Sequence, residues 1–526
     1  VQTCALPIYI NGNDNTGVYI ANGIVNLGTG TANAINIAGG SGNIGIFAAA
    51  AGDALSTAAN ITVNADSSSG IFAQNTGTVT NTGNISASGA SVKAIIADNT
   101  TVNSTGNITV NGTALSALDG SAGLVAQNGG TLNITGGTTN ITVDGSASTG
   151  LYAGTGSILN LTGGTVTTTG GAFNVFSNGT VNLANTTIDT GASSLAFMAG
   201  TGGRILFNNT TATISGGSNT PATRGTAFLY QGTGHSSFTA GDITTWAANT
   251  FGGTTNQLTL NMNPGSRLFI ASDVAMNLSD TSGSTLSGAL GANIVGTDYK
   301  TFMLYNSKLT IDQNVNLDNS SDAYNMLELA NSSVTNNQTI TGTLSNQTAI
   351  AQEQGVASHQ VNILNNGTIN LSGSGSTGIY AKGSAAGTPN IENSSTGNIN
   401  VADNSAAIYG LGNTTITNNG NITMKANSTG IYSSAKDPNT GSAVGTPSAI
   451  INTGNITSTD SNTVGIYLDT LTTIPTGTMI DNQSTGKISV TGDSSVGIYA
   501  TGAGTFGINN SGEITLGNSS SLSNPS

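Results

Sequence analysis

Charged residues are scarce in this sequence, and basic residues are the scarcest. Its 526 residues include 10 Lys and Arg and 24 Asp and Glu, which gives a formal net charge of −14. Nucleic acids and anionic membranes are bound through clustered basic side chains, so neither is expected as a direct partner. The hydrophobic share of 36% is too high, and the charge too sparse, for a highly charged disordered chain.

Strong helix formers and long apolar runs are also missing. Gly alone accounts for 74 residues, and Asn, Ser and Thr are abundant, whereas Glu, Lys, Arg and Gln are few. The abundant types are poor or middling in helices, which disfavours a large α-helical enzyme. No run approaches the roughly 18 apolar residues that a transmembrane helix needs.

The one cysteine, Cys4, lies in the opening string VQTCALPI (residues 1–8), which fits no later pattern. The string resembles a translated sequencing adaptor, so we interpret residues 1–8 as an artefact; an N-terminal tail with a free thiol is the alternative. A chain without cysteine suits export in an unfolded state, because an early disulfide would block a narrow pore, and suits a reduced cytosol nearly as well. No signal-peptide pattern precedes the repeats, and we expect the chain to be an internal part of a longer protein.

Two short motifs and a third apolar position recur along the chain. The first motif is Gly, then Ile, Leu or Val, then Tyr or Phe, and it begins at Gly17, Gly45, Gly70, Gly150, Gly378, Gly430, Gly465 and Gly497, with weaker copies at Gly123 and Ala407. The second motif is a polar residue, Gly, a further residue and Ile, as in Thr82–Ile85, Asn366–Ile369, Asn419–Ile422 and Thr453–Ile456. The third position is occupied by Val79, Val102, Ile416, Ile450 and Ile508.

The spacing of these positions describes a coil with three sides. In one copy, Val79 precedes Ile85 of the second motif by 6 residues, Ile85 precedes Ile95 by 10, and Ile95 precedes Ile108 of the next coil by 13. The first two distances recur in other copies, whereas the last grows to 25 residues elsewhere. Two constant spacings and one variable spacing predict three short strands, with two tight corners and one connection that accepts loops of any length.

Residues between the glycines alternate between apolar and polar, as in Asn60–Val63, which predicts strands with one face inward. One coil has too few apolar residues to bury a core, so coils must stack. We predict an all-β fold, a right-handed parallel β-helix (β-solenoid) with variable loops. Gly is expected to provide positive φ at the corners, and Asn before Gly, as at Asn366–Gly367, to adopt the left-handed conformation and to ladder its amide with the next coil. A compact antiparallel sandwich is the alternative.

The regularity of the repeats divides the chain. Residues 9–203 and 347–516 are predicted as regular coils, and residues 517–526 as a truncated end. The repeat pattern weakens in residues 204–346. We interpret this segment as irregular coils or an inserted subdomain, with a separate globular domain as the alternative. That segment contains Arg204, Arg224, Arg267, Trp246 and His235.

No catalytic apparatus is visible in the sequence. The two histidines, His235 and His359, lie in no setting typical of a Ser-His-Asp triad, and there is no G-x-S-x-G turn. Metal sites need grouped Cys, His or carboxylates, and none is grouped here. We therefore predict no catalytic, cofactor-binding or metal-binding residues, and a protein that is not an enzyme.

A polysaccharide-degrading β-helix is the sharpest alternative. Such enzymes place paired carboxylates, or Arg with calcium-bound Asp, on one face of adjacent coils. The acids here are spread singly, and we expect them to be solvated loop residues: Asp66, Asp98, Asp144 and Asp403.

With these residues assembled, the sequence resembles the passenger region of a large bacterial autotransporter. The coils with Gly497-Ile498-Tyr499-Ala500 are similar to repeats of adhesin-type passengers, and Leu258–Ile270 (LTLNMNPGSRLFI) is similar to long outer-membrane autotransporters of fusobacterial type. The likeness is at the level of repeats and covers nearly everything after Ile8. It implies a Gram-negative cell-surface protein that is exported and held by a C-terminal β-barrel outside this sequence; a two-partner-secreted exoprotein has similar coils.

We therefore predict a surface-exposed adhesin for attachment to host cells or other bacteria, for aggregation or for biofilm. The expected partners are host or bacterial surface receptors, protein or glycan, and further copies of the chain. No nucleic acid and no cofactor are expected, and the variable loops are the expected place of specific recognition. A carbohydrate-active enzyme and a passive spacer remain the alternatives.

Overall fold

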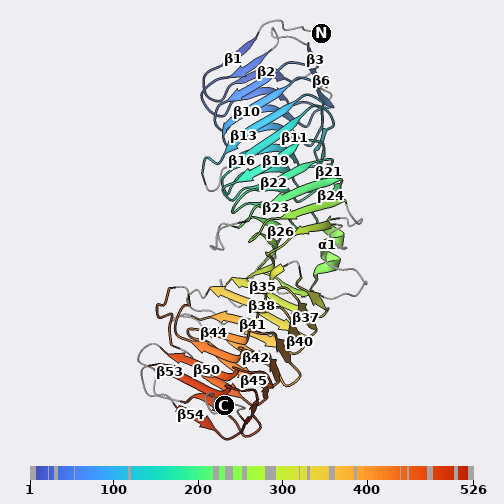
Figure 1. Cartoon of the computed structure of the whole chain (residues 1–526). Coiled ribbons are helices and arrows are strands. Elements are labelled where there is room, and N and C mark those ends of the chain that lie inside the picture. Colours follow the sequence, from blue (N-terminus) through green and yellow to red (C-terminus); the bar gives the residue numbers. More distant parts are fainter. Residues whose placement is uncertain are drawn as a thin grey trace. The chain divides into compact units, whose positions relative to one another are not determined.

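In the computed structural model, the chain forms short strands that pair in parallel from one coil to the next (Figure 1). Every pairing given for the named strands is parallel, which rules out the antiparallel sandwich and confirms an all-β parallel β-helix with variable loops. The structure describes residues 7–21, 23–28, 34–51, 54–116, 120–216, 224–231, 241–251, 257–278, 292–318, 320–327, 332–354, 362–383, 388–438, 440–446, 449–470, 478–502 and 507–518. Most of the opening string of residues 1–8, Cys4 included, lies outside this part, as do His235 and His359.

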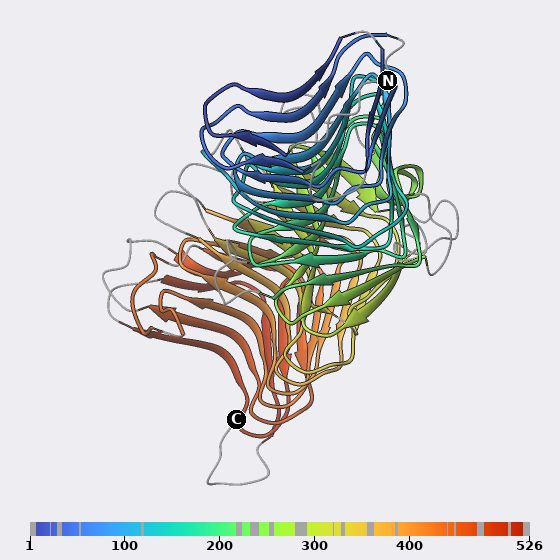
Figure 2. The same ribbon diagram turned by 90° about the horizontal axis from the view of Figure 1, so that it is seen from above.

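The chain divides into two compact units. Unit 1 comprises Val1–Tyr230, Thr244–Phe269 and Gly283–Gly296, and unit 2 comprises Gln231–Ile243, Ile270–Ser282 and Thr297–Ser526. Each unit contains three parallel sheets, which we name after the sequence position that their strands carry: the first-motif, second-motif and third-position sheets. Successive coils of unit 1 lie over one another when the molecule is viewed from above (Figure 2).

The strands of unit 1 are as follows. The second-motif sheet contains β1 (Ile8–Ile10), β4 (Ile35–Ile37), β7 (Ile61–Asn64), β10 (Ile85–Ala90), β13 (Ile108–Thr113), β16 (Thr139–Asp144), β19 (Thr165–Thr169), β22 (Thr187–Thr190), β25 (Thr210–Ile214), β28 (Leu258–Met262) and β31 (Ala292–Gly296). The first-motif sheet contains β2 (Thr16–Ile20), β5 (Ile44–Ala48), β8 (Ser69–Gln74), β11 (Lys93–Asp98), β14 (Ala122–Gln127), β17 (Thr149–Ala153), β20 (Phe173–Ser177), β23 (Leu195–Ala199) and β26 (Thr226–Gln231). The third-position sheet contains β3 (Ile24–Leu27), β6 (Ala54–Thr57), β9 (Val79–Asn81), β12 (Thr101–Ser104), β15 (Thr131–Ile134), β18 (Ile158–Thr162), β21 (Thr180–Ala184) and β24 (Arg204–Asn208).

Unit 2 repeats this arrangement. Its first-motif sheet contains β32 (Tyr299–Tyr305), β35 (Ser320–Leu327), β38 (Thr348–Gln354), β41 (Thr377–Lys382), β44 (Ala406–Leu411), β47 (Thr429–Ser434), β50 (Val464–Thr470) and β53 (Val496–Gly502). Its third-position sheet contains β27 (Gly241–Asp242), β30 (Ala275–Leu278), β33 (Lys308–Ile311), β36 (Ser333–Asn336), β39 (Asn362–Asn365), β42 (Asn390–Asn393), β45 (Thr415–Asn418), β48 (Ile450–Asn452), β51 (Thr478–Asn482) and β54 (Gly507–Asn510). Its second-motif sheet contains β34 (Val315–Asn316), β37 (Thr339–Gly342), β40 (Thr368–Leu371), β43 (Asn398–Val401), β46 (Asn421–Met424), β49 (Asn455–Ser458), β52 (Lys487–Val490) and β55 (Glu513–Leu516). β29 (Arg267–Ser272) has residues of both units.

The core of each unit consists of aliphatic side chains stacked on their own kind. Ile85 of β10 pairs in register with Ile61 of β7 and Ile108 of β13, and none of the three is more than 1% exposed. In unit 2, Ile369 of β40 and Ile399 of β43 pair in the same way and are fully buried. The recurring isoleucines of the sequence therefore face inward, as predicted, and their burial supplies the hydrophobic driving force that a single coil lacks.

A ladder of asparagines runs inside unit 2 beside this aliphatic core. In each coil the Nδ2 of one Asn donates to the Oδ1 of the next at 2.7–2.8 Å. The ladder consists of Asn336, Asn365, Asn393, Asn418, Asn452, Asn482 and Asn510. Because an amide has both a donor and an acceptor, each member satisfies its neighbour, and the first six are fully buried.

The predicted role of Asn366 and Gly367 needs a correction. The inner ladder is formed by Asn365, while Asn366 lies outside it and donates from Nδ2 to Asn337 Oδ1 at 2.9 Å. The laddering of Asn amides is thus confirmed, but the left-handed conformation at Asn366 is wrong, since neither Asn366 nor Gly367 has a positive φ. In unit 2 most left-handed residues other than glycine lie instead at the corner before the first-motif strands, as at Asn427 (φ 55°). Gly367 is required by close approach, because a Cβ there would lie 2.1 Å from the carbonyl oxygen of Gln338.

Residues 204–346, which the sequence marks as irregular, depart from the coil pattern in their described part. In unit 1, β28 and β31 extend the second-motif sheet in register. The third-position sheet ends at β24, and the helix α1 (Ile243–Phe251) follows β26 in the chain. Trp246 of α1 stacks on Tyr230 with ring centroids 4.4 Å apart, and Phe251 is buried against Phe228 at 4.8 Å. Among the described residues no helix is long and apolar enough to cross a membrane.

We predict that Asn393→Ala destabilises its coils by about 1–3 kcal/mol for each buried hydrogen-bonding position left unpaired. These positions are Asn418 Oδ1 and one N–H of Asn365 Nδ2, whose other N–H still donates to Gly367 O. Long repeat arrays do not unfold in one step, so the measurement is hydrogen exchange of the amides in β42 and β45. Asn455→Ala is the control, because its amide donates to Asn421 Oδ1 at the exposed surface. Equal changes in both variants would contradict a special role for the buried ladder.

Gly454→Ala is expected to destabilise the coil that it starts, because the added Cβ would lie 2.1 Å from the carbonyl oxygen of Gly420. Relieving this overlap would push two hydrogen-bonded coils apart, and overpacked sites of this kind lose about 1–3 kcal/mol of stability. Gly39→Ala is the control, since its nearest neighbour, Asn11 O, would be 3.9 Å away. The shift in thermal midpoint of the two variants checks this, and a Gly454→Ala protein as stable as the control would argue against close coil approach as the reason for this glycine.

Candidate functional site

The outward face of the first-motif sheet in unit 2 carries a tyrosine in each of five successive coils. These side chains, which we call the tyrosine column, are Tyr380, Tyr409, Tyr432, Tyr467 and Tyr499. Each follows an apolar residue of the first motif that points into the core, and neighbouring ring centroids are 4.7–5.3 Å apart. The first motif therefore places one aliphatic side chain inside and one aromatic side chain outside in every coil.

Ring orientation changes along the tyrosine column. The planes of Tyr409, Tyr432 and Tyr467 are nearly parallel, at 17° and 24° to one another, whereas Tyr380 and Tyr499 lie at 66° and 73° to their neighbours. The three central rings therefore cover one another's faces. Tyr499 is the most exposed member of the column, at 46%.

A small hairpin lies beside the tyrosine column. After β47 the chain leaves the sheet, and Val444 N donates to Ala435 O at 2.8 Å to close the two arms. The hairpin reaches back two coils, where Lys382 Nζ of β41 lies 3.3 Å from Asp437 Oδ2. The lysine and the aspartate thus form a half-buried ion pair at the side of the column.

Asp469 has a different setting. It lies two residues after Tyr467 on the same outward side of β50, and within the described part of the chain its carboxylate has no hydrogen bond or ion pair. Burial raises the pKa of Tyr409, Tyr432 and Tyr467, and the negative charge of Asp469 raises the pKa of all three further. A hydrogen bond with Ser434 acts in the opposite direction on the pKa of Tyr432. The central tyrosines therefore stay neutral, and an unpaired carboxylate lies next to Tyr467 on the outward side of β50.

Unit 1 has an outward column of its own in the same sequence position. Its members are Tyr19, Phe47, Phe72, Ile96, Val125, Tyr152, Phe176, Met198 and Leu229, and we call them the apolar column. Tyr19 and Phe47 have ring centroids 5.4 Å apart, and Phe47 and Phe72 5.1 Å. The column is less polar than the tyrosine column, and most of its members are partly exposed.

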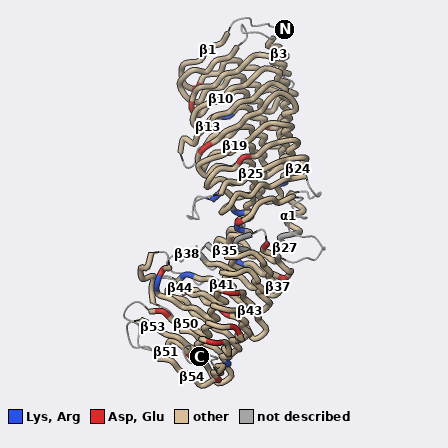
Figure 3. Tube along the Cα trace, viewed as in Figure 1, with Lys and Arg blue, Asp and Glu red and all other residues tan. Residues whose placement is uncertain are grey.

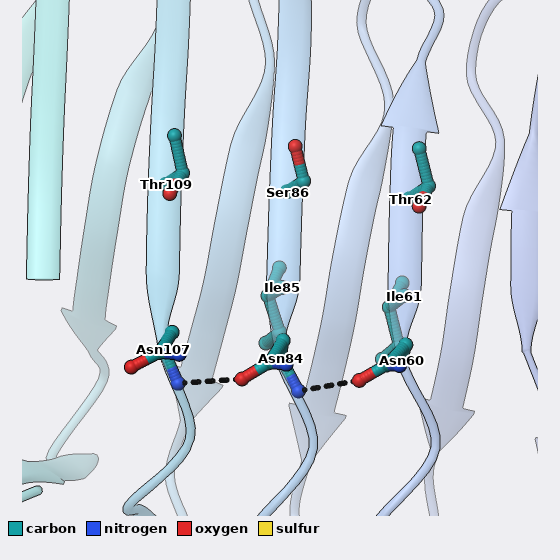
Figure 4. A pocket seen from close by; sticks show the side chains of 8 residues that line it. All are labelled: Asn60, Ile61, Thr62, Asn84, Ile85, Ser86, Asn107 and Thr109. Atoms are coloured by element: carbon teal, nitrogen blue, oxygen red, sulfur yellow. Dashed lines mark hydrogen bonds between the residues drawn. The ribbon is translucent and has the colours of Figure 1, made fainter. Parts of the chain in front are cut away.

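A third candidate is a shallow cavity of about 350 Å³ on the second-motif sheet of unit 1 (Figure 4). Asn60 Oδ1 accepts the backbone N–H of Asn84 at 3.1 Å, and Asn84 Oδ1 accepts that of Asn107 at 3.0 Å. Thr62 and Thr109 point outward beside this row, and no charged side chain lines the cavity. The row can hydrogen-bond a neutral polar ligand, but water offers the same bonds, so it provides little driving force of its own.

Each of the four acids named in the sequence analysis accepts a hydrogen bond from a residue of the next coil. Asp66 Oδ1 accepts from Ala90 N at 2.8 Å, Asp144 Oδ1 from Thr169 Oγ1 at 2.7 Å, and Asp403 Oδ1 from Ala426 N at 3.1 Å. Asp98 departs from expectation: it is 5% exposed at the end of β11, not a solvated loop residue.

The burial of Asp98 has a clear cause. Its carboxylate accepts from Gln127 Nε2 at 2.9 Å and Asn128 Nδ2 at 2.8 Å, so amides of the next coil replace water.

Over the described residues no group of three His, Cys, Asp or Glu could hold a metal ion. Figure 3 shows that charged residues are few along both units and that acidic and basic residues lie together in places, as Lys382 and Asp437 do.

Sequence reasoning missed the outward columns. The recurrence of Tyr or Phe after the apolar residue of the first motif was visible, but it was used only to count coils. The alternation of a strand assigns that residue to the outer face once its neighbour is placed inside. This signal was available, whereas the unpaired state of Asp469 and the position of the hairpin depend on contacts between coils.

Because of the tyrosine column, the folded protein is expected to lose stability as the pH becomes alkaline. Because folding raises the pKa of Tyr409 above 10.0, its ordinary value in the unfolded chain, the folded state keeps its proton where the unfolded state loses it. The resulting stabilisation is fully present below pH 10 and is lost as the pH rises through the folded-state value. We expect tyrosinate absorbance of the folded protein to rise at higher pH than that of the denaturant-unfolded chain. Tyr409→Phe is expected to reduce this difference, and coincident titration curves would contradict the packing of the column.

Comparison with known proteins adds no assignment to these surfaces. No protein-family model matches this sequence, and no curated protein matches it.

Proposed function

We propose that this chain belongs to a surface-exposed bacterial adhesin of the autotransporter-passenger type, which attaches cells to host surfaces or to other bacteria. The observation that carries the proposal is the outward column of aromatic and apolar side chains on the first-motif sheet of each unit. The remaining surface is rich in amides and hydroxyls, and contiguous apolar patches on such a surface mark interaction sites. Tyrosine is rigid, has a polar tip and is enriched in protein interfaces.

The repeat itself supports binding to a cell surface. A column offers similar contacts at intervals of about 4.8 Å, so several weak contacts can form along one partner. Contacts that are linked in one chain act together through a high effective concentration. The expected partners are protein or glycan receptors of host or bacterial cells, and other copies of the chain. The scarcity of Lys and Arg disfavours nucleic acid.

Display of the chain on non-adherent bacteria, through a heterologous outer-membrane anchor, tests this proposal. We expect the displaying cells to aggregate or to attach to host cells in numbers well above cells that carry the anchor alone. Surface exposure is checked with an antibody to a terminal tag, and folding by protease resistance. A folded, displayed chain that causes neither attachment nor aggregation would contradict the adhesin function and favour the passive spacer.

The double variant Tyr432→Ser and Tyr467→Ser tests the tyrosine column directly. We expect attachment to fall at least about tenfold, because exposed aromatic anchors dominate binding energy at interfaces. The control is Thr423→Ala with Thr457→Ala, which alters outward side chains of the second-motif sheet in the same two coils. Tyr→Phe at both positions keeps the stacked rings should the Ser variant not fold. Equal attachment by the column variants and the control would place binding elsewhere.

A further inference from the structure

The carboxylate of Asp469 is the one feature of the tyrosine column that stacking does not explain. Its register partners in the adjacent coils are Ser434 and Thr501, so it faces no basic side chain across the sheet. Other acids on unit 2 strands have partners: Asp481 accepts from Asn509 Nδ2 at 2.7 Å, and Glu513 lies 3.8 Å from Lys487. Within the described residues Asp469 therefore offers two oxygens with free hydrogen-bonding capacity.

The groups around Asp469 are also acceptors or aromatic rings. Tyr467 lies on the same outward side of β50 as Asp469, Tyr432 is the register partner of Tyr467 in the preceding coil, and Tyr499, its partner in the next coil, has an exposed ring. A carboxylate accepts only, and a neutral phenol can accept as well as donate. A ligand that has several donors, no acceptor and a positive charge fits this set best. Guanidinium and ammonium groups have that chemistry, and both interact favourably with tyrosine rings.

We propose that Asp469 and the tyrosine column bind lysine or arginine side chains on the surface of a partner protein. The proposal deepens the proposed adhesin function and rests on it. A guanidinium group can pair with the Asp469 carboxylate through two N–H donors while its plane lies over the exposed ring of Tyr499. The formal charge of −14 on the chain favours approach of a basic surface over long range.

The other charges near the column do not compete for this role. Lys382 is held by Asp437 at 3.3 Å, so that pair is locally neutral. Lys436 is exposed and extends toward Gly441 at the turn of the hairpin. Its neighbour Ala435 donates its backbone N–H to the Asp469 carbonyl oxygen at 2.8 Å, yet the Lys436 side chain forms no ion pair with Asp469. Among the described residues the Asp469 carboxylate is therefore an acceptor that no neighbouring cation occupies. An acidic glycan or acidic protein surface would be repelled at this position, which separates the proposed partner from other receptors.

The test compares two fluorescent peptides on the purified whole chain. One contains four arginines, and the other contains four citrullines, which keep the shape and lose the charge. We expect the arginine peptide to bind at least about tenfold more tightly, as charged hydrogen bonds allow, and the difference to shrink at high salt. Equal binding of the two peptides would overturn the proposal and favour a neutral partner.

Asp469→Asn gives the site-specific control, since it keeps the shape of a side chain that has no partner in the described structure. We expect it to abolish the preference for arginine. Asp189→Asn removes the same charge from an exposed position of β22 in unit 1 and is expected to keep the preference. If the two variants behave alike, binding follows net charge alone and the site is wrong.

The same variants on displayed cells separate this inference from the adhesin function. Attachment by the wild-type chain without any arginine preference would leave the adhesin function standing and reject the cation site. An arginine preference that depends on Asp469, in a chain that never attaches cells, would support the site and reject the adhesin function.

Discussion

Each coil of this protein must accept a near copy of itself about 4.8 Å above and below, in register. At that spacing every side chain on a strand faces the corresponding side chain of the next coil, so like charges would repel and unequal volumes would leave gaps. Aliphatic, amide, hydroxyl and aromatic groups can all stack on their own kind. The low charge and the abundance of Ile, Asn and Thr follow from this constraint. Several acids occur where the next coil supplies a hydrogen-bond donor, as Gln127 does for Asp98.

The same constraint explains where the chain can vary. Glycine at the tight corner before the second-motif strands brings two backbones so close that a Cβ would overlap a carbonyl oxygen, as at Gly454. Insertions are confined to positions where coils do not need to touch. In unit 2 the long connections follow first-motif strands, between β41 and β42, β47 and β48, and β50 and β51. The connection of variable length therefore begins beside the tyrosine column, which is why the hairpin after β47 lies next to that column.

Periodicity in the sequence was enough to predict the coil, its three strands, the inward isoleucines and the parallel stacking. It could not separate two adjacent asparagines such as Asn365 and Asn366, because both fit the same motif and only the register with Asn393 decides which is inside. The helix α1 was not predicted, since its sequence has no strong helix formers and its position depends on packing of Phe251 against Phe228. For the candidate site, the aromatic repeat is visible in the sequence. That the Asp469 carboxylate has no partner among the described residues can be known only from the contacts between neighbouring coils.

An outward aromatic column can serve stability and binding at once, and the two roles differ in what they require of the side chain. Stacked rings contribute about 0.5–1.5 kcal/mol per pair, which explains an aromatic residue in each coil. Stacking alone would be served equally by phenylalanine, as at Phe47 and Phe72 in unit 1. The tyrosine column instead has a hydroxyl in all five coils and, at Asp469, an acid without a partner among the described residues. Apart from the hydrogen bond of Tyr432 with Ser434, stacking needs none of these polar groups, and the proposed contact with a positively charged partner would account for them.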